Sequence, residues 1–243
     1  MGQGDVTVRY ENGTPVPPDG EAVGGPSSNN SSAPFLSDSI TLKAGVKLDI
    51  FQINSHKSKN SNIALRLHSE KFTNALYAVT EPYCDKYGNL KFIGSRGLKV
   101  IQSAKRVVVE NQEAKEKVRA AIIHSNHLPV TPLQQFCSAD MAVGMITYQP
   151  KGRAAWQKKT LCIVSSYWDI KRDAVPEELT AFIDHARKKN WDLQVHMDSN
   201  SHSTLFGSRD QNKRGDTLEE YLAQHGLIPM NVGSDPTFFG GTG

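Results

Sequence analysis

From Lys47 onward, the sequence alternates between short apolar runs rich in β-branched residues and longer amphipathic stretches. This alternation is typical of an α/β domain, in which buried strands are layered against helices. The apolar runs predict six strands: Leu48–Asn54, Ala75–Glu81, Arg119–His124, Met141–Thr147, Leu161–Tyr167 and Leu193–Asp198. The amphipathic stretches predict three helices, the last with Thr217 as its N-cap: Asn62–Phe72, Pro176–Lys189 and Leu218–Gln224.

The first part of the chain has a different composition. Between Asn12 and Ser39 it consists mostly of Gly, Pro, Ser and Asn, which bury too little apolar surface to offset the entropy lost on ordering. We therefore expect residues 1–45 to form a disordered leader and residues 46–243 to form the folded domain.

The overall composition narrows the class of protein. No apolar run approaches the ~18 residues that a transmembrane helix needs, so no membrane partner is expected. The net charge of +3 is compatible with a polyanionic partner but does not require one. The three cysteines are far apart and form no CxxC pair, which favours a reducing compartment. The sequence contains neither a G-x-G-x-x-G nor a Walker A loop, which argues against a nucleotide-binding doubly wound sheet.

Polar side chains stand at the ends of four predicted strands. Asn54 ends the first strand, Glu81 the second, Tyr167 the fifth and Asp198 the sixth, with Asn200 two residues beyond. Sites collect at strand ends because the loops there are exposed yet anchored on a rigid sheet. Any one of these residues is readily explained as a cap or turn former. Together, such oxygen ligands suit Mg²⁺, which keeps several waters and binds phosphate oxygens.

The segment Asp198–Asn212 is the densest polar stretch of the chain. A carboxylate and an amide at Asp198 and Asn200 could polarise a water or hold a phosphate, and His202 could neutralise a phosphoryl oxygen. An Asx-rich turn between a strand and a helix explains the same residues equally well. His196 adds the alternative of a zinc site with Asp198 and His202, although no further His or Cys cluster completes its ligand set.

At these residues the sequence resembles the endonuclease domain of non-LTR retrotransposons, within the endonuclease/exonuclease/phosphatase superfamily. The resemblance extends from about Leu48 to Phe238. Its carriers are LDIFQIN with KSKNSN, TEPY, RAAIIH, CSADMAV, IVSSYW and above all MDSNSHSTLFGSRDQNKRGDTLEEYL. It implies a DNase I-like, four-layered α/β sandwich, in which two mixed β-sheets face each other and helices flank them.

The resemblance also implies a function. Members of this family hydrolyse a phosphodiester of double-stranded DNA with Mg²⁺, for which Mn²⁺ can substitute, and the resulting nick primes reverse transcription. The implied partners are therefore double-stranded DNA and a reverse transcriptase domain in the parent polyprotein. The implied location is the nucleus, although the sequence shows no targeting signal.

Carried over residue by residue, the resemblance assigns a role to each strand-end side chain. Glu81 corresponds to the metal-binding carboxylate and Asn54 to its supporting amide. Tyr167 corresponds to the phenol that contacts the scissile phosphate. Asp198 corresponds to the acid that orients the attacking water or protonates the leaving oxygen, and Asn200 to an amide that contacts the phosphate.

Other residues are assigned by their place near these side chains. His202 lies in the family's catalytic loop and is included among the catalytic candidates. The expected DNA-backbone contacts are basic residues around the mouth of the site: Lys57, Lys59, Arg209, Lys213 and Arg214.

The sequence departs from the family at its C-terminal end. Family members continue beyond the Pro-Thr-Phe at Pro236–Phe238 into an Asp-bearing strand and then a Ser-Asp-His motif, and this sequence has neither. We therefore expect a C-terminally incomplete sandwich with its last strands missing and exposed edges. The departure leaves the activity of the chain open.

Two alternatives to a DNA endonuclease remain at this point. The same fold also serves phosphodiesterases and phosphatases that act on small or lipid phosphoesters. A catalytically dead remnant that binds nucleic acid is the other alternative, and the missing C-terminal motif favours it. The block from Gly207 to Gly215, Gly-Ser-x-Asp followed by Arg-Gly, favours the endonuclease.

Overall fold

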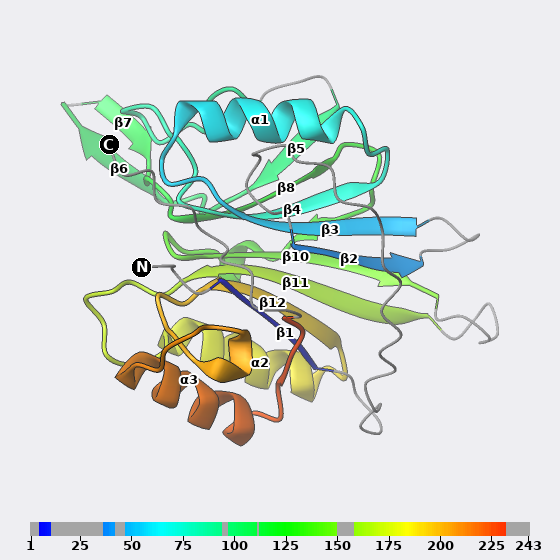
Figure 1. Cartoon of the computed structure of the whole chain (residues 1–243). Coiled ribbons are helices and arrows are strands. Elements are labelled where there is room, and N and C mark those ends of the chain that lie inside the picture. The colour runs from blue at the N-terminus through cyan, green and yellow to red at the C-terminus, as the bar shows by residue number, and fades with distance from the viewer. Residues whose placement is uncertain are drawn as a thin grey trace.

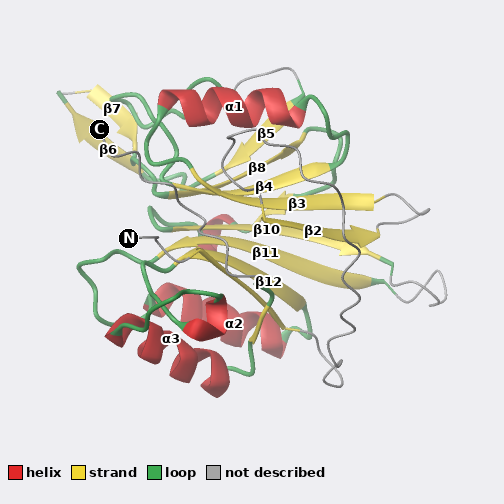
Figure 2. Ribbon diagram, viewed as in Figure 1, coloured by secondary structure: helices red, strands yellow, loops and turns green. Residues whose placement is uncertain are grey.

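Two β-sheets lie face to face, and helices cover their outer faces (Figures 1 and 2). The structure is a computed structural model that describes residues 5–10, 36–41, 47–93, 97–110, 112–149 and 158–231. The order of layers is helix, sheet, sheet and helices, which is the four-layered α/β sandwich expected from the sequence.

The first sheet has five strands. Their order is β2 (Leu36–Thr41), β3 (Lys47–Asn54), β4 (Ala75–Thr80), β8 (Ala120–Ser125) and β5 (Leu98–Ile101). β3 and β4 are parallel, and the helix α1 (Lys59–Ser69) connects them. The other pairs are antiparallel. α1 lies on the outer face of this sheet (Figure 1).

The second sheet has six strands. Their order is β13 (Ile228–Pro229), β1 (Asp5–Tyr10), β12 (Asp192–Asp198), β11 (Lys159–Tyr167), β10 (Met141–Tyr148) and β9 (Thr131–Pro132). β11 and β12 are parallel and are connected by α2 (Glu177–Lys188). α2 and α3 (Lys213–Gln224) cover the outer face (Figure 1).

Four smaller elements complete the described fold. β6 (Arg106–Val109) and β7 (Gln112–Lys115) form a separate antiparallel hairpin. Two short 3₁₀ helices, η2 (Gln134–Phe136) and η3 (Thr204–Phe206), follow β9 and β12 respectively. None of the helices in the described part of the chain is long and apolar enough to cross a membrane.

β11 is buried on both of its faces, which explains its continuous apolar sequence. Leu161 and Ile163 pack in the cluster between the two sheets, whereas Cys162 and Val164 pack in the cluster beneath α2 and α3. All four side chains are at most 2% exposed. A strand buried on both faces has no polar alternation, so its sequence is a nearly unbroken apolar stretch.

All six predicted strands are present, and their boundaries agree with the predicted ones within two residues. The helices differ more at their starts. α1 begins at Lys59 because the Ser58 side chain accepts a hydrogen bond from the Ser61 amide. α3 begins at Lys213, so the prediction of Thr217 as its N-cap is wrong. Asn212 is the cap, and its Oδ1 accepts from both the Gly215 and the His202 amides.

The segment expected to be a disordered leader contributes two strands. β1 pairs with β12 and β13, and β2 pairs with β3. The prediction of disorder is therefore wrong for these two strands, because a sheet edge supplies backbone partners whatever the composition of the added strand. Because β1 covers β12 and β2 covers β3, neither β12 nor β3 is a sheet edge; the edge strands are β13 and β9 in one sheet and β2 and β5 in the other. The other residues of the expected leader lie outside the described residues.

Candidate active site

The candidate site lies between the two sheets, at the end where four strands terminate. Asn54 and Thr80 are paired at the ends of β3 and β4, and Tyr167 and Asp198 are paired at the ends of β11 and β12. Asn54 Nδ2 donates to Asp198 Oδ2 at 2.5 Å, which joins one sheet to the other. The fold thus brings together side chains that are 144 residues apart in sequence.

Asp198 is the most buried ionisable group of the site, with an exposed fraction of 0%. Its Oδ2 accepts from Asn54, while its Oδ1 has no hydrogen-bond partner among the described residues. Burial, and then repulsion from the nearby Glu81 carboxylate, raises the pKa of Asp198 to about 7. A carboxyl group with such a pKa can accept or donate a proton near neutral pH.

Glu81 directly follows β4 and adopts a left-handed conformation, with φ +46°. Its amide donates to the Arg119 carbonyl, and its own carbonyl accepts from the Lys57 amide at 2.7 Å. The Glu81 side chain is only 11% exposed, and Lys57 Nζ lies 2.9 Å from its Oε1. His56 Nδ1 lies 3.8 Å from Oε2. Lys57, expected to contact DNA, therefore pairs with the predicted metal ligand.

Tyr167 is held by a cluster of charges. The guanidinium of Arg119 lies over its ring, 4.9 Å from the centroid. Arg119 is fixed by a bidentate pair with Asp140, at 2.5 and 2.7 Å, and by a further contact with Asp169. Burial, followed by the negative charges of the site, raises the pKa of Tyr167, so the phenol stays protonated and can donate a hydrogen bond.

The loop after β12 is fixed by backbone contacts. Asn200 has φ +49°, and its Nδ2 donates to the Trp168 carbonyl at 3.1 Å. The Arg214 guanidinium stacks 3.8 Å from the centroid of the Trp168 ring and donates to the carbonyls of Trp168, Ser199 and Arg172. Arg214, expected to contact DNA, is thus engaged in holding the loop that carries Asn200.

The remaining predicted residues lie around this loop and the turn after β3. His202 Nδ1 lies 2.8 Å from Asp210 Oδ1, so its described side-chain partner is Asp210. Lys59, Arg209 and Lys213 are all exposed. Lys59 Nζ lies 4.8 Å from the Phe92 ring centroid.

Sequence reasoning missed the support of Tyr167. Arg119 and Asp140 stand directly before the buried strands β8 and β10, and each was read only as part of a strand boundary or a motif. A charged residue next to a fully buried strand must find a partner, because an unpaired buried charge is costly. Pairing the two flanking charges would have indicated this bridge.

The described residues contain no group of three or more His, Cys, Asp or Glu side chains that could hold a metal ion. This finding disfavours the zinc alternative, and His196 is buried with an exposed fraction of 2%. Mg²⁺ needs fewer protein ligands because it keeps its waters and binds substrate phosphates. The Glu81 carboxylate, whose charge acts on the buried carboxyl group of Asp198, fits that requirement.

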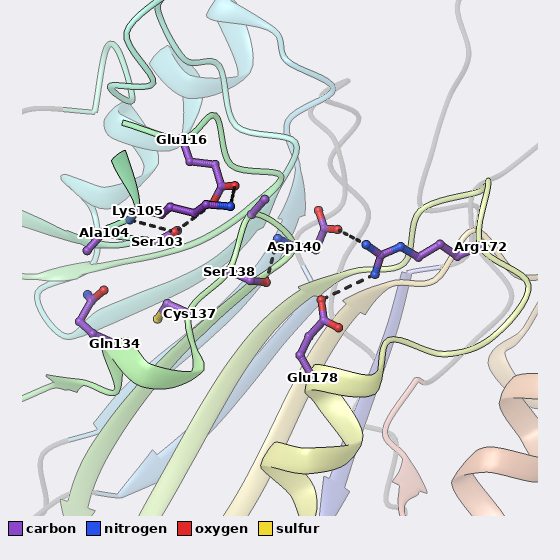
Figure 3. Close-up of a pocket in the computed structure, with 11 residues that line it drawn as sticks. Ser103, Ala104, Lys105, Glu116, Gln134, Cys137, Ser138, Asp140, Arg172 and Glu178 are labelled. Carbon is purple, nitrogen blue, oxygen red and sulfur yellow. Dashed lines mark hydrogen bonds and ion pairs between the residues drawn. The ribbon is translucent and has the colours of Figure 1, made fainter. Parts of the chain in front are cut away.

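A separate polar cavity of about 400 Å³ adjoins the Arg119–Asp140 bridge. In Figure 3, Arg172 lies between Asp140 and Glu178, at 3.9 and 3.8 Å from their carboxylate oxygens. Lys105 pairs with Glu116 on the other side of the cavity. Because Asp140 belongs both to the cavity wall and to the bridge, this cavity is next to the candidate site.

Comparisons with known proteins agree with this architecture. Residues 161–242 match the sequence profile of the endonuclease-reverse transcriptase family. Among solved structures, the fold is similar to the endonuclease domain of TRAS1, a telomere-specific non-LTR retrotransposon. The two chains are 26% identical, the TM-score is 0.54, and the match covers 78% of this chain and 75% of that one. A comparison with curated protein sequences found no match. The resemblance to retrotransposon endonuclease domains and the DNase I-like fold are therefore both confirmed.

Proposed function

We propose that this chain, whose fold is similar to a retrotransposon endonuclease domain and whose residues 161–242 match the endonuclease-reverse transcriptase family, is a Mg²⁺-dependent domain that nicks double-stranded DNA. The observation that carries the proposal is the contact between Asn54 and Asp198 across the two sheets, beside the Glu81 carboxylate. That contact supports the proposal, because a carboxyl group able to exchange protons near neutral pH lies close to a carboxylate of the kind that hard cations bind.

Asp198 is the proposed proton-transfer group. Its Oδ2 is held by Asn54, and its buried Oδ1 has no hydrogen-bond partner among the described residues, so Oδ1 is the atom to which we assign contact with a water or a leaving oxygen. A pKa of about 7 makes both the proton-accepting and the proton-donating form available. In the proposed reaction, water attacks the phosphorus and one bridging P–O bond breaks, leaving a phosphate end and a hydroxyl end.

Glu81 is the proposed metal ligand, with Asn54 supporting it from the adjacent strand end. A bound Mg²⁺, or Mn²⁺ in its place, would supply Lewis-acid stabilisation of the charge that develops on the phosphate. The amide of Asn54 already accepts from His56 through Oδ1 and donates to Asp198 through Nδ2. Its proposed contribution is therefore to fix the separation of the two acids.

Tyr167 and Asn200 are the proposed phosphate contacts. The phenol of Tyr167 stays protonated and is held in place by Arg119, so it can donate to a phosphoryl oxygen. Lys59, Arg209 and Lys213 are exposed and supply positive charge for the DNA backbone. A nick that ends in a 3′-hydroxyl is what a reverse transcriptase would extend, which makes such a domain in the parent polyprotein the proposed partner and the nucleus the proposed location.

The test is nicking of supercoiled plasmid with Mg²⁺ and with EDTA. We expect Mg²⁺-dependent nicking that falls by about 100-fold or more in Asp198→Asn, which is typical for loss of a general acid or base. Asp184→Asn, at an exposed position of α2, is the matched control and should nick at the wild-type rate. Asp198→Asn rates within about tenfold of wild type, a loss of only ~1.4 kcal/mol in the barrier, would contradict the assigned role.

Two further assays, hydrolysis of a small phosphodiester and DNA binding in EDTA, separate the alternatives. A folded chain that hydrolyses a small phosphodiester such as bis-p-nitrophenyl phosphate but leaves plasmid intact would be a phosphodiesterase of this fold. A chain that binds DNA equally well in EDTA and cleaves neither substrate would be a non-catalytic remnant. Either result would overturn the proposed endonuclease activity.

A further inference from the structure

The turn between β3 and α1 places Lys57 in an ion pair with the carboxylate of Glu81. Lys57 Nζ lies 2.9 Å from Glu81 Oε1, and the lysine side chain is 66% exposed while that of Glu81 is 11% exposed. The pair therefore joins a nearly buried acid to the end of a side chain that can move into solvent. Such a lysine can leave its partner at little steric cost.

The backbone of this turn fixes where Lys57 starts. His56 and Lys57 are both left-handed, with φ +47° and +54°. The turn is held by hydrogen bonds from the His56 amide to Asn54 Oδ1, from the Ser58 amide to the Ser55 carbonyl, and from the Lys57 amide to the Glu81 carbonyl. Two consecutive non-glycine residues in this region cost roughly 1–2 kcal/mol each, so the surrounding contacts must over-determine the turn.

An ammonium group and a divalent cation bound to the same carboxylate repel each other, so each weakens the binding of the other. Both are positive, and an ammonium group offers no lone pair to a metal. A divalent cation that binds the Glu81 carboxylate is therefore opposed by the ammonium group of Lys57, and the repulsion is relieved when Lys57 Nζ moves into solvent. The Lys57 backbone can stay anchored to the Glu81 carbonyl while only the exposed side chain moves.

We propose that Lys57 competes with the divalent cation for Glu81: its ammonium group neutralises the carboxylate in the metal-free protein and lowers the affinity of the site for metal. This inference rests on the proposed function, because it takes Glu81 as the metal ligand. It assigns to Lys57 a role in setting the metal affinity, in place of the simple DNA-backbone contact expected from sequence. Lys59, two residues further on, has no such contact with Glu81 among the described interactions.

The test measures Mn²⁺ binding to the DNA-free protein by electron paramagnetic resonance, which counts free Mn²⁺ and needs no catalysis. We expect Lys57→Met to bind Mn²⁺ about tenfold more tightly than wild type, a gain of ~1.4 kcal/mol. Lys59→Met, which removes the same charge nearby, should change the affinity by less than about twofold. In the Glu81→Gln background, Lys57→Met should have no effect, because the carboxylate for which the two cations compete is gone.

The outcomes separate this inference from the proposed function. If the wild-type protein binds Mn²⁺ and Lys57→Met binds it with equal or lower affinity, the proposed competition is overturned while the metal site stands. Tightening that persists in Glu81→Gln would also overturn it, because the effect would then be one of general charge. No binding by any variant at millimolar Mn²⁺ would overturn both the inference and the metal dependence. Lys57→Gln serves as a second variant, and circular dichroism confirms that each variant is folded.

Discussion

Arg119 is the side chain on which the support of Tyr167 depends. It is 30% exposed, and its bidentate partner Asp140 is 5% exposed. Removing one member of such a pair leaves the other charge without compensation in a poorly solvated place. The bridge is therefore expected to matter for stability as well as for the position of the phenol.

A double-mutant cycle of Arg119→Gln and Asp140→Asn tests this expectation. We expect each single substitution to lower the free energy of unfolding by about 2–4 kcal/mol, and the double variant to lose less than the sum, with a coupling energy of about 1–3 kcal/mol. Urea unfolding measures all four proteins. The matched control is Lys86 with Glu110, whose side chains are 56% and 66% exposed. Its coupling should stay below about 1 kcal/mol. Equal coupling in the two pairs would contradict the assigned importance of the bridge.

The residue scale also shows what sequence can and cannot predict. Asn54, Glu81, Tyr167 and Asp198 were identified because strand ends of a layered fold are recognisable, and the structure places all four at one end of the sandwich. The pairing of Lys57 with Glu81 was not predicted. It depends on left-handed backbone in the turn, and no pattern of residue types specifies that conformation for a histidine followed by a lysine.

At the scale of elements, α3 positions the loop that follows β12. Gly215 lies in the first turn of α3, and a Cβ added there would lie 1.9 Å from the His202 carbonyl oxygen. The obstructing atoms are backbone, so a small rotation of a side chain cannot relieve the clash. The close approach of helix and loop brings Arg214 to the carbonyls of Trp168 and Ser199.

Gly215→Ala should therefore destabilise the protein although alanine is the better helix former. Propensity alone favours alanine by about 1 kcal/mol, whereas forcing α3 away from the loop is expected to cost about 2–4 kcal/mol. Thermal unfolding and plasmid nicking measure the two consequences, and we expect both the melting temperature and the nicking rate to fall. Glu220→Ala, at an exposed position of the same helix, should leave both unchanged. A stabilised Gly215→Ala variant would show that the contact is not as close as described.

The elements that sequence failed to predict share a physical cause. The strands β3, β4, β8, β10, β11 and β12 are mostly buried, so their apolar runs identify them. β1 and β2 lie at the two ends of the Gly-, Pro-, Ser- and Asn-rich stretch and are fixed by pairing with β12 and β3. Tertiary contacts therefore make these two strands ordered. The cap of α3 depends on tertiary contacts too, because the Asn212 side chain also accepts a hydrogen bond from the His202 amide in the loop. The local amino-acid composition of a segment does not indicate such contacts.

At the scale of the whole molecule, polar contacts reinforce the apolar packing between the two sheets. Gln52 Nε2 donates to the Met197 carbonyl, and Ser165 Oγ donates to the Val79 carbonyl, each across the space between the sheets. His196 lies in β12, beside Ser165, and is 2% exposed. Burial lowers the pKa of His196 from 6.5 to about 3. The folded sandwich therefore holds this imidazole neutral at pH values where the unfolded chain protonates it.

The pH dependence of stability follows from that difference. Below pH 6.5 the unfolded state binds a proton that the folded state does not, so stability is lost as the pH falls from about 6.5 towards 3. At pH 4.5 the loss from this one group is about 2–3 kcal/mol, at 1.36 kcal/mol for each pH unit. Asp198, with its raised pKa, acts in the opposite direction: its ionisation lowers the free energy of unfolding as the pH rises towards 7. The wild-type curve alone therefore cannot isolate His196.

Substitution of His196 by glutamine isolates it. His196→Gln loses packing and is expected to be less stable than wild type at pH 7.5, by about 1–3 kcal/mol. Its stability should then fall less steeply on acidification, so that the difference narrows or reverses by pH 4.5, because glutamine takes up no proton in the unfolded chain. Urea unfolding between pH 7.5 and 4.5 measures the two curves. His127→Gln, at an exposed histidine, should run parallel to wild type. If the stability of His196→Gln instead fell with pH in parallel to that of the wild type, the acid sensitivity would come from groups other than His196.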